Sequence, residues 1–441
     1  MPRVVAILCE VIYHIRMVKN KIILIISLAI VFLATLFLWF FKTPFIVNEA
    51  NDSHIFLPWP ETSPVTKPPE GSAGAEADIW VEADAFDGSE FSDTEGDFED
   101  ASDIYLKSLI DVLPMISGPL ELSVEGATGW AAVAIPLYSE ADTESDTVAD
   151  FDDGQVFAII EEQGEWWYVR CSNGESGWVE HMACFINLPD VIPSIVYNIT
   201  NAYSALTHSS GYEIPGVTGQ KLYEAGPVYN PRLSRDEFIV PTLYSTSKLL
   251  FAAQHLALEA GDTIILHEAY RDHASQQRSV RLLRELMDEN ENVRSAIEDG
   301  PWSLNWFIAT ALSNHQRGVA FDASLGKILS YEIEQIGEVF LPVITEYEEY
   351  SMPTTIHELS PLAATLIRPV SSRDRDAWRN VPLTRAMTPG AKLLQKYFDE
   401  AGMTPLASEW WHFNDLEGVE TATELDIRGS FLLGEILSEL P

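Results

Sequence analysis

An uncharged apolar segment of 20 residues, Ile22–Phe41, constrains the fold of this chain more than any other feature. A helix of that length spans about 30 Å, the thickness of the hydrocarbon core of a bilayer. Basic residues are concentrated before it, and an acidic stretch follows Lys42. We therefore expect a single transmembrane helix over 22–41, with residues 1–21 in the cytoplasm and the rest of the chain outside. A cleaved signal peptide is the alternative, although no small-residue cleavage site follows the segment.

Residues 42–120 are predicted to form a flexible acidic linker. Residues 48–105 contain sixteen acidic residues and one Lys, with frequent Pro, Gly, Ser and Ala. Such a segment buries too little apolar surface to offset its ordering entropy. The whole chain has 27 Lys and Arg against 67 Asp and Glu, a formal net charge of -40. This balance argues against a nucleic-acid partner, because phosphate binding needs clustered basic side chains.

From about residue 125 the chain changes to short segments of alternating apolar residues separated by turn signals, which predict a small all-β barrel over 125–188. The order of its motifs, Trp-Tyr-x-Val, a Gly turn and Gly-Trp-Val, resembles bacterial SH3 domains. The residues that carry the resemblance are Trp167, Tyr168, Val169, Gly174, Gly177, Trp178 and Val179. The resemblance implies binding to cell-wall peptides, and a structural spacer is the alternative.

Two of the three cysteines, Cys171 and Cys184, lie in this predicted barrel. Outside the cell they could form a disulfide bond, because that compartment is oxidising. Two free buried thiols are the alternative.

The region 191–441 is long enough for one further domain, in which helix and strand signals mix without a regular βαβ alternation. Ser245 or Thr246 is expected to cap a helix that Gly261 ends, and Thr388-Pro389 is expected to open another. The segments TIILHEAY, GVAFDAS and EWWHF have the pattern of strands. We expect an α+β domain with a mainly antiparallel sheet.

Three strings in this region carry residues suited to chemistry: LSNHQRGVAFDAS, SEWWHF and EAYRDHASQQ. Two imidazoles and a carboxylate, His315, His412 and Asp322, can supply three ligands of a tetrahedral Zn²⁺ and leave a fourth position open. Gly318 lets the chain turn between the first two ligands. Glu409 precedes His412 by three residues, so a straight strand would point them to opposite faces. A bulge, a strong twist or a strand end is needed to bring both to one point.

A carboxylate in that position can take a proton from water and later deliver it to a leaving amine, which is a role for Glu409. Arg271 can stabilise a developing oxyanion or hold a carboxylate.

Taken together, His-x6-Asp after a Ser and the later Glu-Trp-Trp-His resemble the zinc D-alanyl-D-alanine dipeptidases of the vancomycin-resistance type. These belong to a group of D-Ala-D-Ala peptidases that share a fold with the hedgehog signalling domain. The similarity covers about residues 191–415 and includes AYRDHASQQ. It implies zinc ligands at His315, Asp322 and His412, a catalytic base at Glu409, transition-state stabilisation by Arg271, and a substrate-carboxylate contact at Ser313.

The chain departs from the family where an Asp holds the free ammonium group of the substrate. The corresponding segment here is MPTTIHE, which places His357 at that position with Glu358 beside it. A neutral His is a poor partner for an ammonium group. Either Glu358 replaces the Asp, or the substrate has no free amine there and is a peptide stem.

These observations predict a membrane-anchored extracytoplasmic zinc peptidase that acts on D-Ala-containing wall peptides. It would be a dipeptidase that splits free D-Ala-D-Ala, or a carboxypeptidase that trims stem peptides. A non-catalytic wall-binding protein on a retired peptidase fold is an alternative from another class. A retired site commonly loses its base or a ligand, whereas Glu409 and all three ligands are present here.

Overall fold

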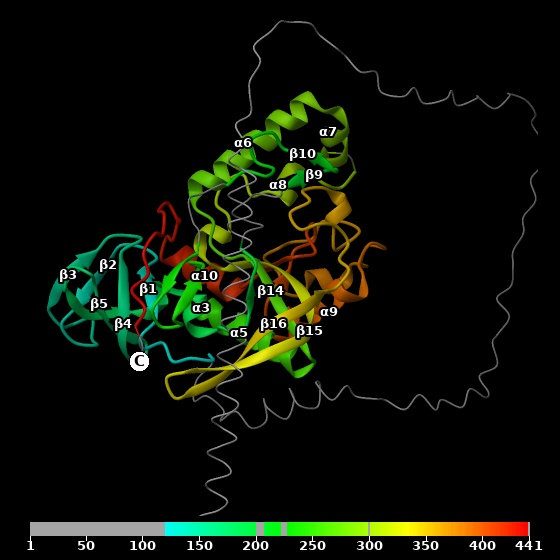
Figure 1. The fold of residues 1–441 in the computed structure, drawn as a ribbon. Helices are drawn as coiled ribbons and strands as arrows, with labels where there is room; N and C mark the ends of the chain where they lie inside the picture. Colours follow the sequence, from blue (N-terminus) through cyan, green and yellow to red (C-terminus); the bar gives the residue numbers. More distant parts are fainter. Residues whose placement is uncertain (1–119, 200–206, 222–226, 299, 440–441) are drawn as a thin grey trace, which may run out of the picture. The chain divides into compact units, whose positions relative to one another are not determined.

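The computed structural model describes residues 120–199, 207–221, 227–298 and 300–439 (Figure 1). All of them belong to the second of two compact units, Asp93–Pro441. The expected transmembrane helix over 22–41 and all but the last residue of the expected linker lie outside the described residues. Within the described ranges, no helix is both long and apolar enough to cross a membrane.

The N-terminal sheet has eight strands in the order β13-β7-β1-β4-β5-β6-β2-β3, and neighbouring strands are antiparallel. Seven strands come from the segment expected to form a barrel: β1 (Thr128–Ala131), β2 (Ile135–Tyr138), β3 (Thr147–Phe151), β4 (Val156–Gln163), β5 (Trp166–Arg170), β6 (Ser176–Glu180) and β7 (Cys184–Asn187). The eighth, β13 (Pro241–Leu243), comes from the following region and pairs with β7. The two regions therefore share one sheet.

Alternation along β5 explains why this segment forms a sheet with one buried face. Trp167 and Val169 are fully buried, and Tyr168 between them is half-buried. Gly174 lies in the turn between β5 and β6 with φ of 89°, a conformation that glycine adopts without strain. Both Cys171 and Cys184 are free and buried. The structure thus has the two-thiol arrangement, and burial raises the pKa of Cys171 to about 11.

The second sheet carries the residues with chemical potential. Its order is β17-β18-β15-β14-β8, with β16 paired to β15. The pairs are antiparallel except β14 with β8, which agrees with the expected mainly antiparallel sheet. Its strands are β8 (Val196–Tyr197), β14 (Asp262–Glu268), β15 (Ala320–Ile336), β16 (Val339–Glu349), β17 (Thr404–Pro405) and β18 (His412–Asn414).

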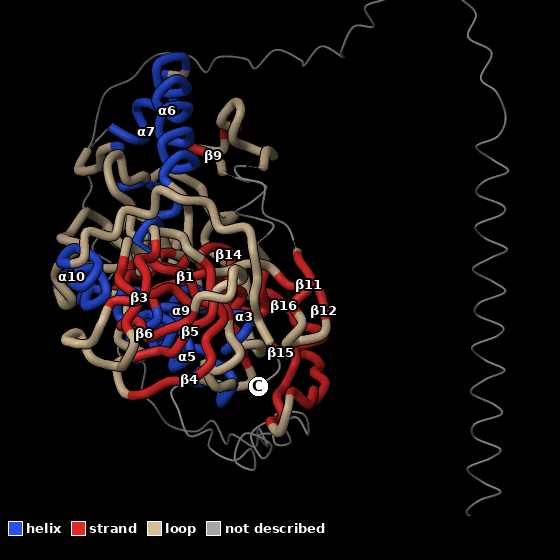
Figure 2. The backbone as a smooth tube through the Cα atoms, turned by 90° about the vertical axis from the view of Figure 1, so that its left-hand side faces the viewer, coloured by secondary structure: helices blue, strands red, loops and turns tan. Residues whose placement is uncertain are grey.

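Helices, 3-10 turns and small hairpins make up the rest of the regular structure in the described residues. The helices are α3 (Leu188–Val191), α5 (Tyr244–Glu259), α6 (His273–Glu289), α7 (Glu291–Glu298), α8 (Leu304–Phe307), α9 (Pro389–Glu400) and α10 (Leu416–Glu424), with 3-10 turns η1 (His181–Ala183), η2 (His315–Arg317), η3 (Pro361–Ala363) and η4 (Ala377–Asn380). The hairpins are β9 (His208–Ser209) with β10 (Tyr212–Glu213), and β11 (Val228–Asn230) with β12 (Arg235–Glu237). Helix α5 contacts β14 and α9 contacts β15. Figure 2 shows α6 and α7 set apart from the two larger sheets, next to the short strand β9.

The two expected helices form, and one of the expected caps is wrong. Thr388 caps α9 as predicted, because its hydroxyl accepts a hydrogen bond from the amide of Ala391 at 3.1 Å. Helix α5 instead begins at Tyr244, so Ser245 and Thr246 lie inside its first turn. The hydroxyl of Thr246 donates to Asp415 Oδ2 at 2.7 Å. The side chain of Thr246 therefore bonds to Asp415, which is distant in sequence, and does not cap the helix.

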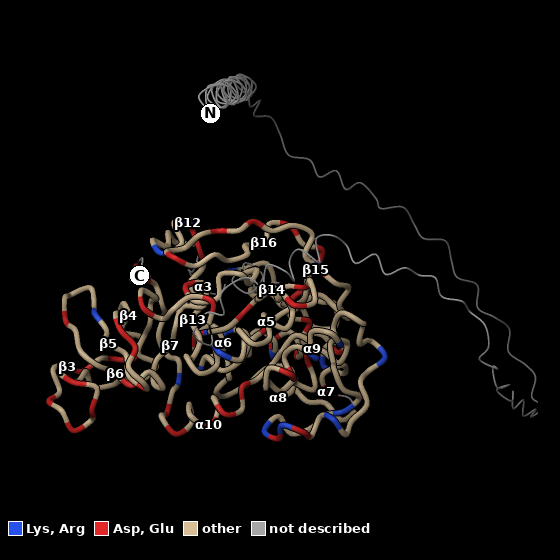
Figure 3. Tube along the Cα trace, turned by 90° about the horizontal axis from the view of Figure 1, so that it is seen from below, with Lys and Arg blue, Asp and Glu red and all other residues tan. Residues whose placement is uncertain are grey.

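One hydrophobic core runs through both regions. At their junction the ring of Trp167 meets that of Tyr244, with centroids 4.7 Å apart. Charged residues are distributed unevenly along the chain, and the loop between β2 and β3 is acidic (Figure 3). That loop carries Glu140, Asp142, Glu144 and Asp146 and no basic residue.

Candidate metal centre and cavity

Strand pairing brings the two distant motifs of the sequence together. Asp322 on β15 lies opposite His412 on β18 and, on its other side, opposite Glu268 on β14. His315 begins the 3-10 turn η2, directly before β15. Gly318 ends this turn with φ of 65°, and a Cβ there would lie 2.8 Å from the amide nitrogen of Leu243. Glycine is therefore required for the chain to bring His315 back toward Asp322.

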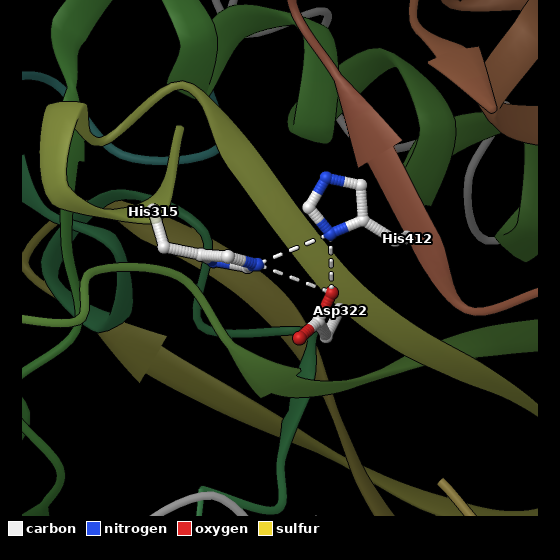
Figure 4. Close-up of side chains that lie close together, drawn as sticks. All are labelled: His315, Asp322 and His412. Carbon is white, nitrogen blue, oxygen red and sulfur yellow. Dashed lines mark hydrogen bonds and ion pairs between the residues drawn. The ribbon is translucent and has the colours of Figure 1, made fainter. Parts of the chain in front are cut away.

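Three ligand atoms converge at this point (Figure 4). His315 Nε2 lies 3.2 Å from His412 Nδ1 and 3.3 Å from Asp322 Oδ1, and His412 Nδ1 lies 2.9 Å from the same oxygen. Ligands about 2.0–2.1 Å from a tetrahedral metal ion lie about 3.3 Å apart. The spacing and the buried setting of His315, Asp322 and His412 thus fit a metal ion such as zinc.

The other ring nitrogen of each histidine faces an acceptor. His315 Nδ1 lies 2.7 Å from the carbonyl oxygen of Ala269, and His412 Nε2 lies 3.0 Å from Asn414 Oδ1. Asn414 Oδ1 is held in turn by the side-chain amide of Asn314 at 2.7 Å. These acceptors favour the tautomers in which the inward-facing nitrogens carry a lone pair, as metal ligands require.

The second oxygen of Asp322 is held by basic groups. His357 Nε2 lies 3.1 Å from Asp322 Oδ2, and Arg271 Nη2 lies 3.7 Å from the same atom. Burial alone would raise the pKa of Asp322, but His315, His357 and His412 lower it well below its usual range. The carboxylate is therefore ionised, as a metal ligand must be.

Glu409 lies beside the three ligand atoms, with Oε2 3.7 Å from His412 Nδ1. A turn at Trp410 and Trp411 separates it from the first residue of β18. Because the strand begins only at His412, the side chains of Glu409 and His412 can point to the same side, as their spacing in the sequence required. Burial raises the pKa of Glu409 to about 8, and Asp322 adds to the increase.

Arg271 is held rigidly next to this group. Its Nε donates to Glu268 Oε1 at 2.7 Å, Nη2 contacts Glu268 Oε2, and Nη1 donates to Gln276 Oε1 at 2.7 Å. The sequence interpretation missed Glu268 and Gln276. Both lie within six residues of Arg271, at the end of a strand and the start of a helix. In the sequence, only this closeness to Arg271 indicated that Glu268 and Gln276 could contact it.

A second group that satisfies ligand distances is Glu268, Asp322 and His357. It shares Asp322 with the first, and both oxygens of Glu268 are already bound by the guanidinium group of Arg271. A cation there would face that positive charge at short range. The first group is therefore the better metal site.

These residues line one cavity of about 680 Å³. Lining residues include all three ligands, Glu409, Arg271, Ser313 and His357, and also Arg317 and Arg373. Ser313 is held by the ligand turn, because its hydroxyl accepts from the amide of His315 at 3.3 Å.

Glu358 is not among the lining residues. Its carboxylate accepts hydrogen bonds from the amides of Ser210 and Gly211 and from the hydroxyl of Ser360. Glu358 therefore anchors the β9–β10 hairpin, and its carboxylate oxygens are bound by groups of the protein itself. His357, with φ of 61°, turns its ring into the cavity instead.

Comparison with known families identifies the N-terminal part of the described chain. The family model of the bacterial SH3 domain matches residues 132–183. This confirms the resemblance carried by the motifs at 167–169 and 177–179. No curated protein matches the chain.

Within the SH3 domain the motif residues divide into core and surface. Trp167 is buried, and its indole nitrogen donates to Glu162 Oε1 at 3.1 Å. Tyr168 and Trp178 are half-buried neighbours with ring centroids 5.4 Å apart. Gly177 is tightly enclosed, since a Cβ there would lie 2.7 Å from the carbonyl oxygen of Tyr138.

Proposed function

We propose that this chain is a zinc metallopeptidase that hydrolyses D-Ala-D-Ala or D-Ala-terminated peptides of the cell wall. The observation that carries the proposal is the convergence of His315, Asp322 and His412 beside Glu409 and Arg271 in one cavity. The family resemblance of residues 191–415 supplies the substrate class.

Zinc held by His315, Asp322 and His412 would polarise a scissile carbonyl and lower the pKa of water. The residues of the chain perform the remaining tasks. Glu409 is proposed to take the proton of the attacking water and to deliver it to the leaving amine. A buried carboxyl with a pKa of about 8 needs a nearby positive charge to act as a base at neutral pH, and a dication on the three ligands would provide it.

Arg271 is proposed to stabilise the oxyanion that develops on the substrate carbonyl. Its guanidinium group is planar and held by Glu268 and Gln276, so little reorganisation is needed when charge develops. Ser313 lines the same cavity and is proposed to contact the substrate carboxylate.

The surroundings of His357 support a substrate without a free amine at that position. His357 already hydrogen-bonds to Asp322, and Glu358 is engaged by the β9–β10 hairpin. Neither residue offers a carboxylate to an ammonium group in the cavity. We therefore favour stem peptides, cut by carboxypeptidase action, over the free dipeptide.

The bacterial SH3 domain is consistent with binding to the cell wall. We propose that it holds the peptidase next to its polymeric substrate, and that the apolar segment 22–41 anchors the chain in the cell membrane with the described domains outside.

The test is product analysis with the zinc-loaded protein, using free D-Ala-D-Ala beside a pentapeptide stem that ends in D-Ala-D-Ala. Release of D-Ala from the stem supports a carboxypeptidase, and cleavage of only the free dipeptide supports a dipeptidase. If neither substrate is cut by zinc-loaded protein, the proposal is wrong.

A further inference from the structure

The cavity carries positive charge that the proposed peptidase mechanism does not use. Two arginines, Arg317 and Arg373, line it in addition to Arg271. All acidic residues that line the cavity belong to the metal group or hold Arg271: Glu268, Asp322 and Glu409. The wall formed by Arg317 and Arg373 therefore has no lining carboxylate of its own.

Arg317 is fixed in this wall by the turn that carries a metal ligand. It is the last residue of η2, two positions after His315, and its Nη1 donates to the hydroxyl of Thr423 on α10 at 3.2 Å. Its Nε is buried and has no hydrogen-bond partner within the described residues. A buried donor without a partner costs free energy.

Arg373 reaches the same wall from another segment. Ser372 beside it also lines the cavity, and Arg375 ties this segment to Glu417 of α10 at 3.2 Å.

Neither arginine forms an ion pair with a carboxylate anywhere in the described part of the chain. Asp426, in the segment after α10, is itself paired with Arg428 at 3.0 Å. Arg317 and Arg373 therefore bring two guanidinium groups to one cavity without an ion-paired carboxylate, and a bound anion would pair with them.

We propose that Arg317 and Arg373 form an anion subsite that binds a carboxylate of the peptide substrate. The inference rests on the proposed function and adds a recognised substrate group to it, namely a peptide carboxylate outside the scissile amide bond. Guanidinium groups suit this ligand, because their planar donors match the two oxygens of a carboxylate. The carboxylate is either the C-terminal one of the peptide or that of an acidic residue before the D-Ala-D-Ala unit.

The experiment compares two pairs of peptides in the zinc-loaded full chain. One pair is N-acetyl-Glu-Ala-D-Ala-D-Ala and its Gln counterpart, and the other is N-acetyl-D-Ala-D-Ala as free acid and as C-terminal amide. For each pair, the ratio of kcat/KM and the ratio of Kd by calorimetry are measured in wild type, Arg317→Gln, Arg373→Gln and the double variant. Arg281→Gln on α6 is the matched control, since that arginine is exposed, paired with Glu285 and outside the cavity.

We expect the preference for the carboxylate member of one pair to fall about 10–100-fold in the double variant, because a hydrogen bond to a charged group is lost at each arginine. Arg281→Gln should keep the wild-type ratio. The pair that responds identifies the source of the carboxylate. Arg317→Lys keeps the charge and removes the fork, so it should lie between wild type and Arg317→Gln.

Two results separate this inference from the proposed function. If the peptides are cut but neither ratio depends on Arg317 or Arg373, the subsite is wrong and the peptidase stands. If no peptide is cut but the Kd ratio of one pair falls in the double variant, the subsite stands and the peptidase is wrong. Arg373 is exposed, so its variant remains informative if changes at Arg317 disturb folding.

Discussion

Two buried aspartates show how the same side chain serves structure in one region and a candidate site in another. Asp190 on α3 accepts hydrogen bonds from the amide of Thr128 at 2.9 Å, from Asn230 at 2.5 Å and from the hydroxyl of Ser438 at 2.7 Å. All three donors are neutral. They come from β1, β11 and the C-terminal segment, so Asp190 joins parts of the chain that are distant in sequence.

Asp322 is equally buried but has a different set of neighbours. It faces the ring nitrogens of His315, His357 and His412 and lines a cavity. Asp190 does not line this cavity. A buried carboxylate that neutral donors fully satisfy stabilises the fold, whereas one held among titratable groups beside open space can bind a ligand. The predictions below test this division.

The largest effect is expected from Glu409→Gln. The amide cannot take a proton from water, so kcat should fall toward the upper end of the roughly 10²–10⁴-fold range of a positioned acid/base group. Metal content should stay at the wild-type level. The control is Glu121→Gln, another buried carboxyl on the structural side of the comparison, which should keep wild-type turnover. Near-normal turnover in metal-loaded Glu409→Gln would assign the base to another residue.

Removing a candidate ligand should separate metal binding from folding. His315→Ala and His412→Ala should each reduce zinc affinity by more than the roughly 10–100-fold loss that follows removal of an outer partner. Metal analysis after dialysis measures this, and circular dichroism checks that the fold is retained. His181→Ala in the SH3 domain is the control and should retain its zinc. Full zinc occupancy in both ligand variants would contradict the assignment.

Asp190→Ala should lower the stability of the fold and leave zinc binding unchanged. It leaves the buried amide of Thr128, the amide group of Asn230 and the hydroxyl of Ser438 without their acceptor, so the free energy of unfolding should fall by about 3–5 kcal/mol. Denaturant titration measures the change, with the exposed Asp150→Ala as control. Zinc content per folded molecule should not change. If Asp190→Ala loses metal while its stability is normal, then the assignment of a structural role to Asp190 and a ligand role to Asp322 is wrong.

The same comparison explains what the sequence could and could not predict. The SH3 domain and the Thr388 cap were predictable because their signals are local, with turn glycines, alternating residues and a hydroxyl three residues before the amide that it caps. The hydrogen bond of Thr246 to Asp415 was not, because the partner lies 169 residues away. The pairing of β13 with β7 was missed for the same reason.

For the candidate site, family resemblance supplied what local patterns lack. Nothing in the spacing of His315 and His412 fixes their distance, which depends on the register of β15 with β18. The role of Asn414 emerges only from the tertiary fold, because its partner Asn314 lies 100 residues away, whereas Glu268 holds Arg271 three residues further along the chain.

A third buried carboxyl group, that of Glu121, allows the structural role of a buried acid to be tested through the pH dependence of stability. Burial raises its pKa to about 7, although Ser194 donates two hydrogen bonds to it. Since this value lies above that of the unfolded chain, the folded state binds the proton more tightly. The contribution of Glu121 to the free energy of unfolding is therefore complete below about pH 4.5 and is lost as pH rises to about 7.

We expect Glu121→Gln to remove a decrease of about 3 kcal/mol in the free energy of unfolding over that range. Denaturant midpoints of wild type and variant at pH 5 and pH 8 measure the difference. Equal pH dependence in the two proteins would mean that Glu121 titrates normally.

The smallest effect concerns His357, which touches Asp322 without belonging to the three-ligand group. Its Nε2 holds Asp322 Oδ2 at 3.1 Å, which leaves Oδ1 for the ligand group. His357→Ala removes this partner and should weaken zinc binding by about 10–100-fold, less than either ligand variant. His357→Gln retains a donor and should lie nearer to wild type.

His357→Asp tests the same contact by charge. The new carboxylate would lie near the carboxylates of Asp322 and Glu268. The added negative charge should attract the ammonium group of a substrate. We expect a shift of kcat/KM from N-acylated toward free D-Ala-D-Ala, because only the free dipeptide carries a positive charge at its amine. If wild type already prefers the free dipeptide strongly and Glu358→Gln abolishes that preference, then Glu358 holds the amine. In that case the hairpin anchored on Glu358 must open when substrate binds, and His357 is a structural neighbour of the site.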